Sequence, residues 1–383
     1  MIALHLDGNQ IETITSIAFL TRLNDLRLHN NKIANIEPLR MLTSLIMLSL
    51  DENRIESLDS LSKLTRLTRL WLHRNKITNI DSLKNLTSLT QLSLHANQIR
   101  DIDLLKNLTN LELIYLNDNQ ITSIDSLANL KMLSFVVISK NKIVNVSSLA
   151  NLKRLTFISL SKNQIENIDS IKNLTNLLTL YLDENRLENV DSISNLTNLK
   201  DFRLHNNRVK DISVFRNLKK LKFLSLGYNL IENLEPLRNL KQLEYLLLAN
   251  NSFVSIEPIL DLSLIKRLHL HSTIEIKDMK LIFLKANFFL TSQLRMLTFN
   301  TFDLEIFQQI RTTLAIYSSN TTTFKANNRL YFNELHIETS NDFDFIDCEL
   351  QLFLLKHNVL LNLFVEFQYY NFRRKCSLPN IDF

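Results

Sequence analysis

Asp51, His73 and His95 are the residues of this chain whose types and spacing could do chemistry. They stand 22 residues apart, and Asn117 follows one step further on. Imidazole nitrogens and carboxylate oxygens are zinc ligands, and imidazole titrates near neutral pH, so this set could hold a metal or make a proton-sensitive contact. Histidine is also common on protein surfaces. We therefore predict neither a metal nor a cofactor at this place.

A second regular set consists of nine carboxylates, most of which are followed by Ser or Pro. A row of carboxylates could indicate a metal or catalytic site, but an acidic residue followed by Pro or Ser is also typical of the start of a helix. We predict that these residues cap short helices. They are Glu37, Asp59, Asp81, Asp103, Asp125, Asp169, Asp191, Glu235 and Glu257.

Motifs of enzyme active sites are missing from the sequence. Gly8 and Gly227 are its only glycines, which excludes glycine-rich phosphate loops and nucleophile elbows. Neither His-Glu-x-x-His nor Cys-x-x-Cys occurs. We predict that the protein is not an enzyme.

The elements that position all these residues are defined by an asparagine at every 22nd place. Its amide both donates and accepts hydrogen bonds, so an inward-facing copy in each coil can bind the backbone of its own and the neighbouring coil. We predict that these residues form a structural ladder, which we call the Asn ladder. Its members are Asn9, Asn31, Asn53, Asn75, Asn97, Asn119, Asn141, Asn163, Asn185, Asn207, Asn229 and Asn251.

Around each asparagine the repeat unit reads LxxLxxLxLxxNxIxxIxxLxx. The LxL segment alternates with a period of two and predicts a strand. The LxxLxxL segment has a spacing of three and predicts a 3₁₀ turn or a short helix. One strand and one helical turn in each repeat predict a right-handed coil with parallel strands on one wall, stacked because a single coil cannot bury enough apolar surface to fold.

This unit resembles the leucine-rich repeat family, and in particular the 22-residue subclass shared by the protein phosphatase 1 regulatory subunit and the bacterial internalins. The resemblance implies an α/β solenoid, a curved horseshoe with a parallel sheet on its concave face and 3₁₀ or short helices on its convex face. We place the solenoid in residues 1–272, with twelve repeats and a thirteenth strand. Residues 273–383 are expected to form degenerate coils or a C-terminal cap.

Outward-facing strand positions of such a solenoid vary between repeats, and in this chain several are aromatic or charged. Exposed Trp, Tyr and Arg side chains are typical anchors of protein interfaces. We predict a noncatalytic scaffold that binds a partner protein through the concave face. The predicted contact residues are Arg69, Trp71, His73, His95, Tyr115, Phe135, Phe157, Tyr181, Asp183 and Arg203.

Two alternatives are narrower. The resemblance implies a regulatory subunit of a Ser/Thr protein phosphatase, whose family grips its enzyme with acidic and aromatic residues on the strand wall. Phe135, Phe157, Tyr181, Asp183 and Glu184 occupy comparable places, although interleaved His and Arg depart from an acidic pattern. The other alternative is an extracellular adhesion or receptor fragment, as in the internalins. That alternative predicts sugars on the Asn-Leu-Thr triplets that begin at Asn85, Asn107, Asn173 and Asn195.

Charge and targeting signals limit the partners. The chain has 44 basic and 39 acidic residues, interspersed without a continuous basic stripe, so we predict no nucleic-acid binding. No apolar stretch reaches the length of a membrane span. The repeats contain no Cys, and the start, which is already a repeat strand, does not resemble a signal peptide. We expect a cytoplasmic or nuclear protein, with either an open first coil or a missing upstream segment.

Overall fold

The computed structural model describes residues 2–253, 255–270, 296–299, 334–337 and 363–364. The chain divides into two compact units, Met1–Val209 and Lys210–Phe383. The predicted boundary between residues 272 and 273 lies outside the described residues, so that division into domains stays a prediction.

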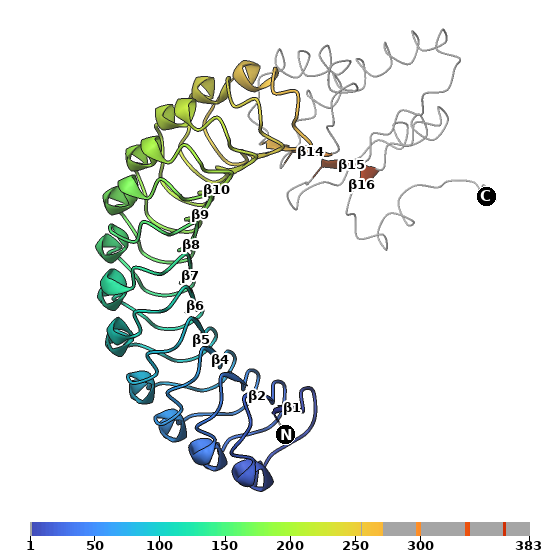
Figure 1. Ribbon diagram of the computed structural model, residues 1–383. Helices are drawn as coiled ribbons and strands as arrows, with labels where there is room; N and C mark the ends of the chain where they lie inside the picture. The colour runs from blue at the N-terminus through green and yellow to red at the C-terminus, as the bar shows by residue number, and fades with distance from the viewer. Residues whose placement is uncertain (1, 254, 271–295, 300–333, 338–362, 365–383) are drawn as a thin grey trace, which may run out of the picture. The chain divides into compact units, whose positions relative to one another are not determined.

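Residues 1–209 form ten short strands, each hydrogen-bonded in parallel to the next one along the chain, with registers of 22 residues. Within this unit the strands line the inner side of a curve (Figure 1). The strands are β1 (Ala3–His5), β2 (Asp25–Arg27), β3 (Met47–Ser49), β4 (Arg69–Trp71), β5 (Gln91–Ser93), β6 (Leu113–Tyr115), β7 (Phe135–Val137), β8 (Phe157–Ser159), β9 (Thr179–Tyr181) and β10 (Asp201–Arg203).

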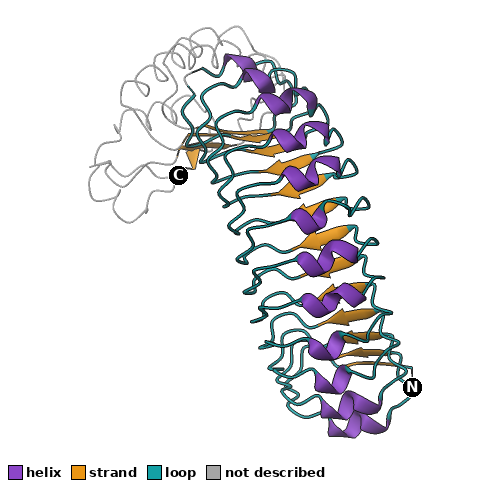
Figure 2. Cartoon of the chain, turned by 90° about the vertical axis from the view of Figure 1, so that its left-hand side faces the viewer, coloured by secondary structure: helices purple, strands orange, loops and turns teal. Residues whose placement is uncertain are grey.

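A short 3₁₀ helix follows every strand from β1 to β9, as the spacing of three predicts, and these helices stack on the opposite wall (Figure 2). The parallel sheet and the 3₁₀ turns confirm the predicted solenoid of leucine-rich coils. The helices of this unit are η1 (Thr15–Phe19), η2 (Glu37–Met41), η3 (Asp59–Leu61), η4 (Asp81–Leu83), η5 (Asp103–Asn107), η6 (Asp125–Asn129), η7 (Ser147–Leu149), η8 (Asp169–Asn173) and η9 (Asp191–Asn195).

The second unit continues the same alternation and then adds wider-spaced strands. The strands β11 to β16 pair in parallel in chain order, and β14 and β15 fall on Leu-rich echoes of the repeat near residues 297 and 335. Its elements are η10 (Ser213–Asn217), β11 (Phe223–Ser225), η11 (Glu235–Leu237), β12 (Tyr245–Leu247), η12 (Glu257–Ile259), β13 (Arg267–Leu270), β14 (Met296–Phe299), β15 (Glu334–Ile337) and β16 (Leu363–Phe364).

The apolar positions of the repeat form the core between the two walls. In the coil around Asn97, for example, Leu92 and Leu94 are 1% and 0% exposed, and Ile99 and Leu105 are both fully buried. Phe202 and Phe215 take the places of smaller residues and are also fully buried. The strand residues between these positions point the other way, so they are free to differ from coil to coil.

The Asn ladder joins each coil to the one before it. Asn163 Nδ2 donates to the carbonyl oxygens of Ile138, Leu160 and Ser161 at 3.1, 2.9 and 3.4 Å. Its Oδ1 accepts from the Ile143 N–H at 3.0 Å. Two of these partners, Ile138 and Ile143, belong to the preceding coil. One buried side chain therefore fixes the stacking distance as well as its own turn.

The prediction that the nine carboxylates from Glu37 to Glu257 cap the helices is wrong, because the capping side chain lies two residues earlier. Each of these carboxylates is the first residue of its 3₁₀ helix, and the residue before it makes no side-chain cap. The backbone N–H of Asp81 instead donates to Asn79 Oδ1 at 2.6 Å, and that of Asp169 to Asn167 Oδ1 at 2.7 Å. The polar side chain two residues earlier caps the helix because the chain turns before the helix begins.

Each coil also needs a left-handed residue directly before its ladder asparagine. Positive φ angles of 53–59° occur there at eleven non-glycine residues, and Gly8 has 69°. A non-glycine residue in this region is strained because its Cβ crowds the carbonyl oxygen.

The alanine at one of these positions, Ala96 (φ 54°), offers a test of this strain. Ala96→Val is expected to lower the free energy of unfolding by about 1–3 kcal/mol, because β-branched residues tolerate this conformation poorly. Ala96→Gly is expected to leave it unchanged or raise it by up to about 1 kcal/mol. Chemical denaturation followed by circular dichroism measures both changes, and equal stabilities of the two variants would contradict the strain.

Candidate protein-binding surface

Six rings on successive coils of residues 1–209 contact one another in an unbroken line, which we call the aromatic band. The ring centroids of neighbours are 4.1–6.4 Å apart, and all six side chains are half-buried. The line bends across the strand wall. Its histidines lie just after their strands, its tyrosines end their strands, and its phenylalanines begin theirs. The aromatic band consists of His73, His95, Tyr115, Phe135, Phe157 and Tyr181.

The wall around the centre of the aromatic band carries no formal charge apart from any on a protonated histidine. The outward places are three per coil: two on the strand and one just after it. Those of β5 to β8 hold aromatic, aliphatic, amide, hydroxyl and imidazole side chains only. At the middle, the rings of Phe135 and Phe157 stack in parallel, with centroids 4.1 Å apart and planes 10° from each other. This surface is therefore apolar at its centre and neutral-polar around it.

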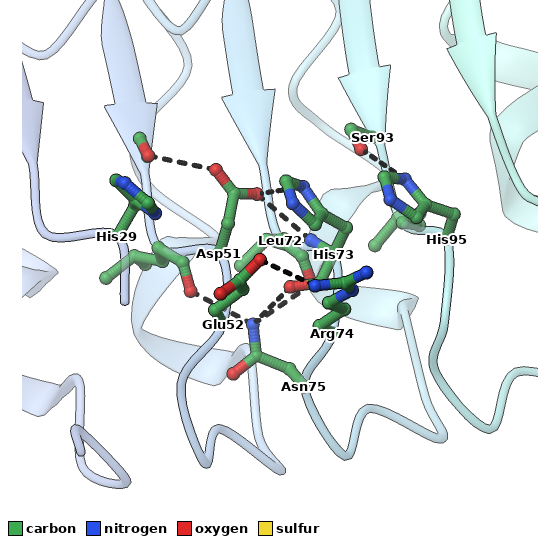
Figure 3. Close-up of polar contacts among 12 residues, drawn as sticks. His29, Asp51, Glu52, Leu72, His73, Arg74, Asn75, Ser93 and His95 are labelled. Carbon is green, nitrogen blue, oxygen red and sulfur yellow. Dashed lines mark hydrogen bonds and ion pairs between the residues drawn. The ribbon is translucent and has the colours of Figure 1, made fainter. Parts of the chain in front are cut away.

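Asp51, His73 and His95 lie side by side at one end of the aromatic band (Figure 3). Asp51 is 4% exposed and accepts hydrogen bonds from the Ser49 hydroxyl at 2.9 Å and the His73 N–H at 3.1 Å. His73 Nδ1 lies 2.7 Å from Asp51 Oδ1, and the two form an ion pair when the imidazole is protonated. The geometry of this contact is not that of a hydrogen bond. The rings of His73 and His95 stack at 4.2 Å, and His95 Nδ1 shares a hydrogen with the Ser93 hydroxyl at 3.0 Å.

This cluster holds its rings through stacking and hydrogen bonds. The carboxylate of Asp51 is used to fix the next strand, because it accepts from the backbone of His73. Within the part of the chain that the structure describes, no group of three or more His, Cys, Asp or Glu is placed to hold a metal ion. The arrangement thus positions two imidazole rings at the border of the aromatic band.

Burial lowers the pKa of His95 to about 4; the charge of His73 adds to this effect, and the charge of Asp51 opposes it. His95 is therefore neutral at pH 7, so this end of the aromatic band carries no charge from His95. The neutral ring can stack on its neighbours without the cost of burying a charge.

This lowered pKa predicts a pH-dependent stability. The unfolded chain protonates His95 near 6.5 and the folded chain near 4, so between these values the unfolded state binds more protons and stability falls with acidification. We expect a loss on the order of 2 kcal/mol from pH 6.5 to 4, allowing for partial exposure. Denaturation of wild type and His95→Gln across this range isolates the effect, and parallel curves would contradict it.

Tyr181, Asp201 and Arg203 close the other end of the aromatic band. The Tyr181 hydroxyl donates to Asp201 Oδ2 at 2.8 Å, and the Arg203 guanidinium lies 4.1 Å above the Tyr181 ring centroid. Arg203 also donates to both carboxylate oxygens of Asp201 at 3.2 Å. Burial and the hydrogen bond with Asp201 raise the pKa of Tyr181 to about 12. The hydroxyl and the ring are held in one orientation.

Asp183 is half-buried and makes hydrogen bonds within the wall. It accepts from the His205 N–H at 2.9 Å and from the Ser161 hydroxyl at 3.1 Å. Its pKa is raised by burial, against the effect of these hydrogen bonds. Asp51 binds the next strand in the same way, and Asp7 also accepts a backbone N–H, from His29 at 2.9 Å. Sequence reasoning missed this role, although an Asp followed 22 residues later by a His marks all three places.

Arg69 and Trp71 lie on β4 outside the aromatic band. Both face outward on one strand, Arg69 exposed and Trp71 half-buried. Trp71 stands in register between Ser49 and Ser93, whose small side chains are buried. Seven of the ten predicted contact residues are thus joined in one connected line from His73 to Arg203, while Arg69, Trp71 and Asp183 lie beside it.

Comparisons with known proteins agree with this architecture. Residues 43–85, 87–129, 175–217 and 197–239 match the family described as leucine rich repeats (2 copies). The structure of an internalin of Listeria monocytogenes is 29% identical with a TM-score of 0.64, over 70% of this chain and 86% of that chain. That of a leucine-rich repeat protein of Leptospira interrogans is 25% identical with a TM-score of 0.71, over 82% of each chain.

A more distant likeness extends to receptors. The ectodomain of a plant membrane receptor kinase from Arabidopsis thaliana, solved in complex with Casparian strip integrity factor 2, is 21% identical. Its TM-score is 0.56, over 80% of this chain and 46% of that chain, so the two share a fold. A comparison with proteins of curated function gives no significant match. No helix in the described parts of the chain is long and apolar enough to cross a membrane.

Proposed function

Because the chain is a leucine-rich repeat protein, with a fold typical of protein–protein interaction, we propose that it is a noncatalytic scaffold that binds a partner protein on the aromatic band. The observation that carries this proposal is the unbroken line of rings at the centre of an uncharged wall. Protein interfaces combine a core depleted in charge and rich in aromatic residues with a polar rim.

The aromatic band is also preorganised. Stacking fixes the rings of Phe135 and Phe157 against each other, and the bond to Asp201 fixes Tyr181. Side chains that are already ordered lose little conformational entropy when a partner binds. Because the faces of Phe135 and Phe157 cover each other, their edges are left for the partner, which favours aliphatic side chains and edge-to-face contacts with aromatic ones.

Affinity capture with the full chain tests this proposal. The concave variant is Phe135→Ala/Phe157→Ala. The matched control is Asn151→Ala/Asn173→Ala, which changes exposed residues on the convex side of the same two coils. Partners recovered from cells of the source organism are quantified by mass spectrometry and then rebound as purified proteins. The proposal requires partners that the concave variant loses and the control retains; loss with both variants, or with neither, contradicts it.

The narrower role of phosphatase regulator is kept as a second proposal because Phe157 and Tyr181 are aromatic residues on the strand wall, where the resemblance implies contacts with the enzyme. Against it, the wall at β6 to β8 is uncharged, and Asp183 is committed to Ser161 and His205. Capture of a purified phosphatase catalytic subunit by wild type, and not by Phe157→Ala/Tyr181→Ala, would support it. Equal or no capture by the two proteins would end it.

The extracellular alternative is favoured by the likeness to an internalin. The asparagines of the four Asn-Leu-Thr triplets are exposed on the convex side, so they are accessible to a glycosyltransferase. A scaffold of the cytoplasm or nucleus would carry no sugar there. A mass shift of the natural protein after treatment with peptide N-glycosidase would support the extracellular alternative, and an unchanged mass would support the cytoplasmic or nuclear one.

A further inference from the structure

Arg69 carries a charge that the wall of residues 1–209 does not balance. On β2 and β10 the wall arginine follows an aspartate two residues earlier, and the two side chains pair: Arg27 with Asp25 at 3.1 Å, and Arg203 with Asp201 at 3.2 Å. On β4 the arginine itself occupies the place of the aspartate, and Trp71 occupies the place of the arginine. The strand therefore has no carboxylate to neutralise it.

Neighbouring strands do not supply one either. In register, Arg69 stands between Met47 on β3 and Gln91 on β5. Asp51, the acidic residue of the neighbouring coil on this wall, is buried and already bound to Ser49 and His73. Among the residues that the structure describes, Arg69 makes no ion pair, and its side chain is exposed.

We propose that the partner of the aromatic band is an extended protein segment with an acidic side chain that pairs with Arg69 and apolar side chains that lie on Phe135 and Phe157. This inference rests on the proposed function and adds the chemistry of its partner. A guanidinium at the edge of an uncharged, aromatic surface prefers a carboxylate, which it binds through two parallel hydrogen bonds. A partner segment that lies along the wall covers the exposed side chain of Arg69, and the reduced access of water strengthens this pair.

The geometry also sets the spacing within the partner. Phe135 and Phe157 lie three and four strands from Arg69, and at about 4.8 Å per strand this is about 14–19 Å. An extended chain rises about 3.3 Å per residue, so the acidic residue is expected about four to six positions from the apolar pair. Trp71, the only tryptophan of the protein, lies two residues from Arg69 on the same face, and its fluorescence reports a segment bound at this end.

The probe is a phage-displayed library of random 12-residue peptides, panned on the immobilised full chain and counter-selected on Phe135→Ala/Phe157→Ala. We expect the peptides that depend on the two rings to carry Asp or Glu at this spacing and to change Trp71 fluorescence. Arg69→Gln should lower the affinity for a synthetic peptide of a selected sequence about tenfold, whereas Arg69→Lys should lower this affinity less. Arg66→Gln, which removes the same charge from an exposed position before β4, should leave its affinity within about twofold.

The outcomes separate this inference from the proposed function. If no enriched peptide depends on Phe135 and Phe157, the proposed function fails. If ring-dependent peptides are enriched without an acidic residue, or bind Arg69→Gln as well as wild type, the proposed function stands and the acidic partner is wrong. A loss with Arg66→Gln equal to that with Arg69→Gln would show a general effect of net charge and would also overturn the inference.

Discussion

Asn163→Ala is expected to lower the free energy of unfolding by about 3–4 kcal/mol, because it removes a buried side chain that bonds two coils to each other. The backbone partners of Asn163 are affected unequally. The Ile138 and Leu160 carbonyls keep donors, because they also accept from Asn141 and Asn185 of the Asn ladder. The buried N–H of Ile143, in contrast, has Asn163 Oδ1 as its acceptor, and alanine leaves it unpaired.

Two further variants identify the cause. Asn163→Asp keeps the acceptor for Ile143 but loses the three donated bonds and places a charge in a buried turn, so it should also destabilise the protein. Asn9→Ala removes an exposed member of the Asn ladder that donates within its own coil at 2.9 and 3.2 Å. Because those groups are open to water, its cost should be below about 1 kcal/mol.

Guanidinium denaturation measures the overall change in stability for these variants. A solenoid is stabilised by contacts between neighbouring coils, so hydrogen exchange of the Ile143 amide gives the local change independently of cooperativity. Equal stabilities of Asn163→Ala and Asn9→Ala, or unchanged protection of Ile143, would contradict this account of the Asn ladder.

The order of the strands and the positions of the core residues could be predicted from the sequence. The period of 22 residues fixes which strands are neighbours, and the alternation around Leu92 and Leu94 fixes which side chains enter the core. The position of the residue that caps each helix, in contrast, could not be predicted from the sequence. A carboxylate and the Asn or Ser two residues before it both suit a cap by composition, and the turn angles decide between them.

The internal organisation of the wall depended on side-chain geometry. The repeat places Tyr115 and Phe135 on adjacent strands but at different outward positions, and only their rotamers bring the rings to 5.3 Å. Asp201 was not among the predicted contact residues, because its importance comes from pairing with Tyr181 and Arg203. The left-handed residues were also missed, since glycine marks such a place and eleven of the twelve are other residues.

The second large effect concerns binding. Phe135→Ala/Phe157→Ala should weaken binding of the partner by about 2–4 kcal/mol, which raises the dissociation constant about 30- to 700-fold. The two rings stack on each other at 4.1 Å and contact Tyr115 and Tyr181 at 5.3 Å, so their removal splits the aromatic band into two separate ends. The lost surface lies at the centre of the uncharged wall, where truncation of an aromatic side chain costs most.

Gln91→Ala is the matched control for this prediction, because Gln91 occupies the same outward place on β5, is half-buried like the two phenylalanines, and lies outside the aromatic band. Isothermal titration with the purified partner should give a change of less than about threefold for Gln91→Ala. Denaturation of the double variant should show a smaller loss than Asn163→Ala, because the rings are half-buried and their loss leaves no buried polar group unpaired. A double variant that binds as tightly as Gln91→Ala would place the interface elsewhere on the molecule.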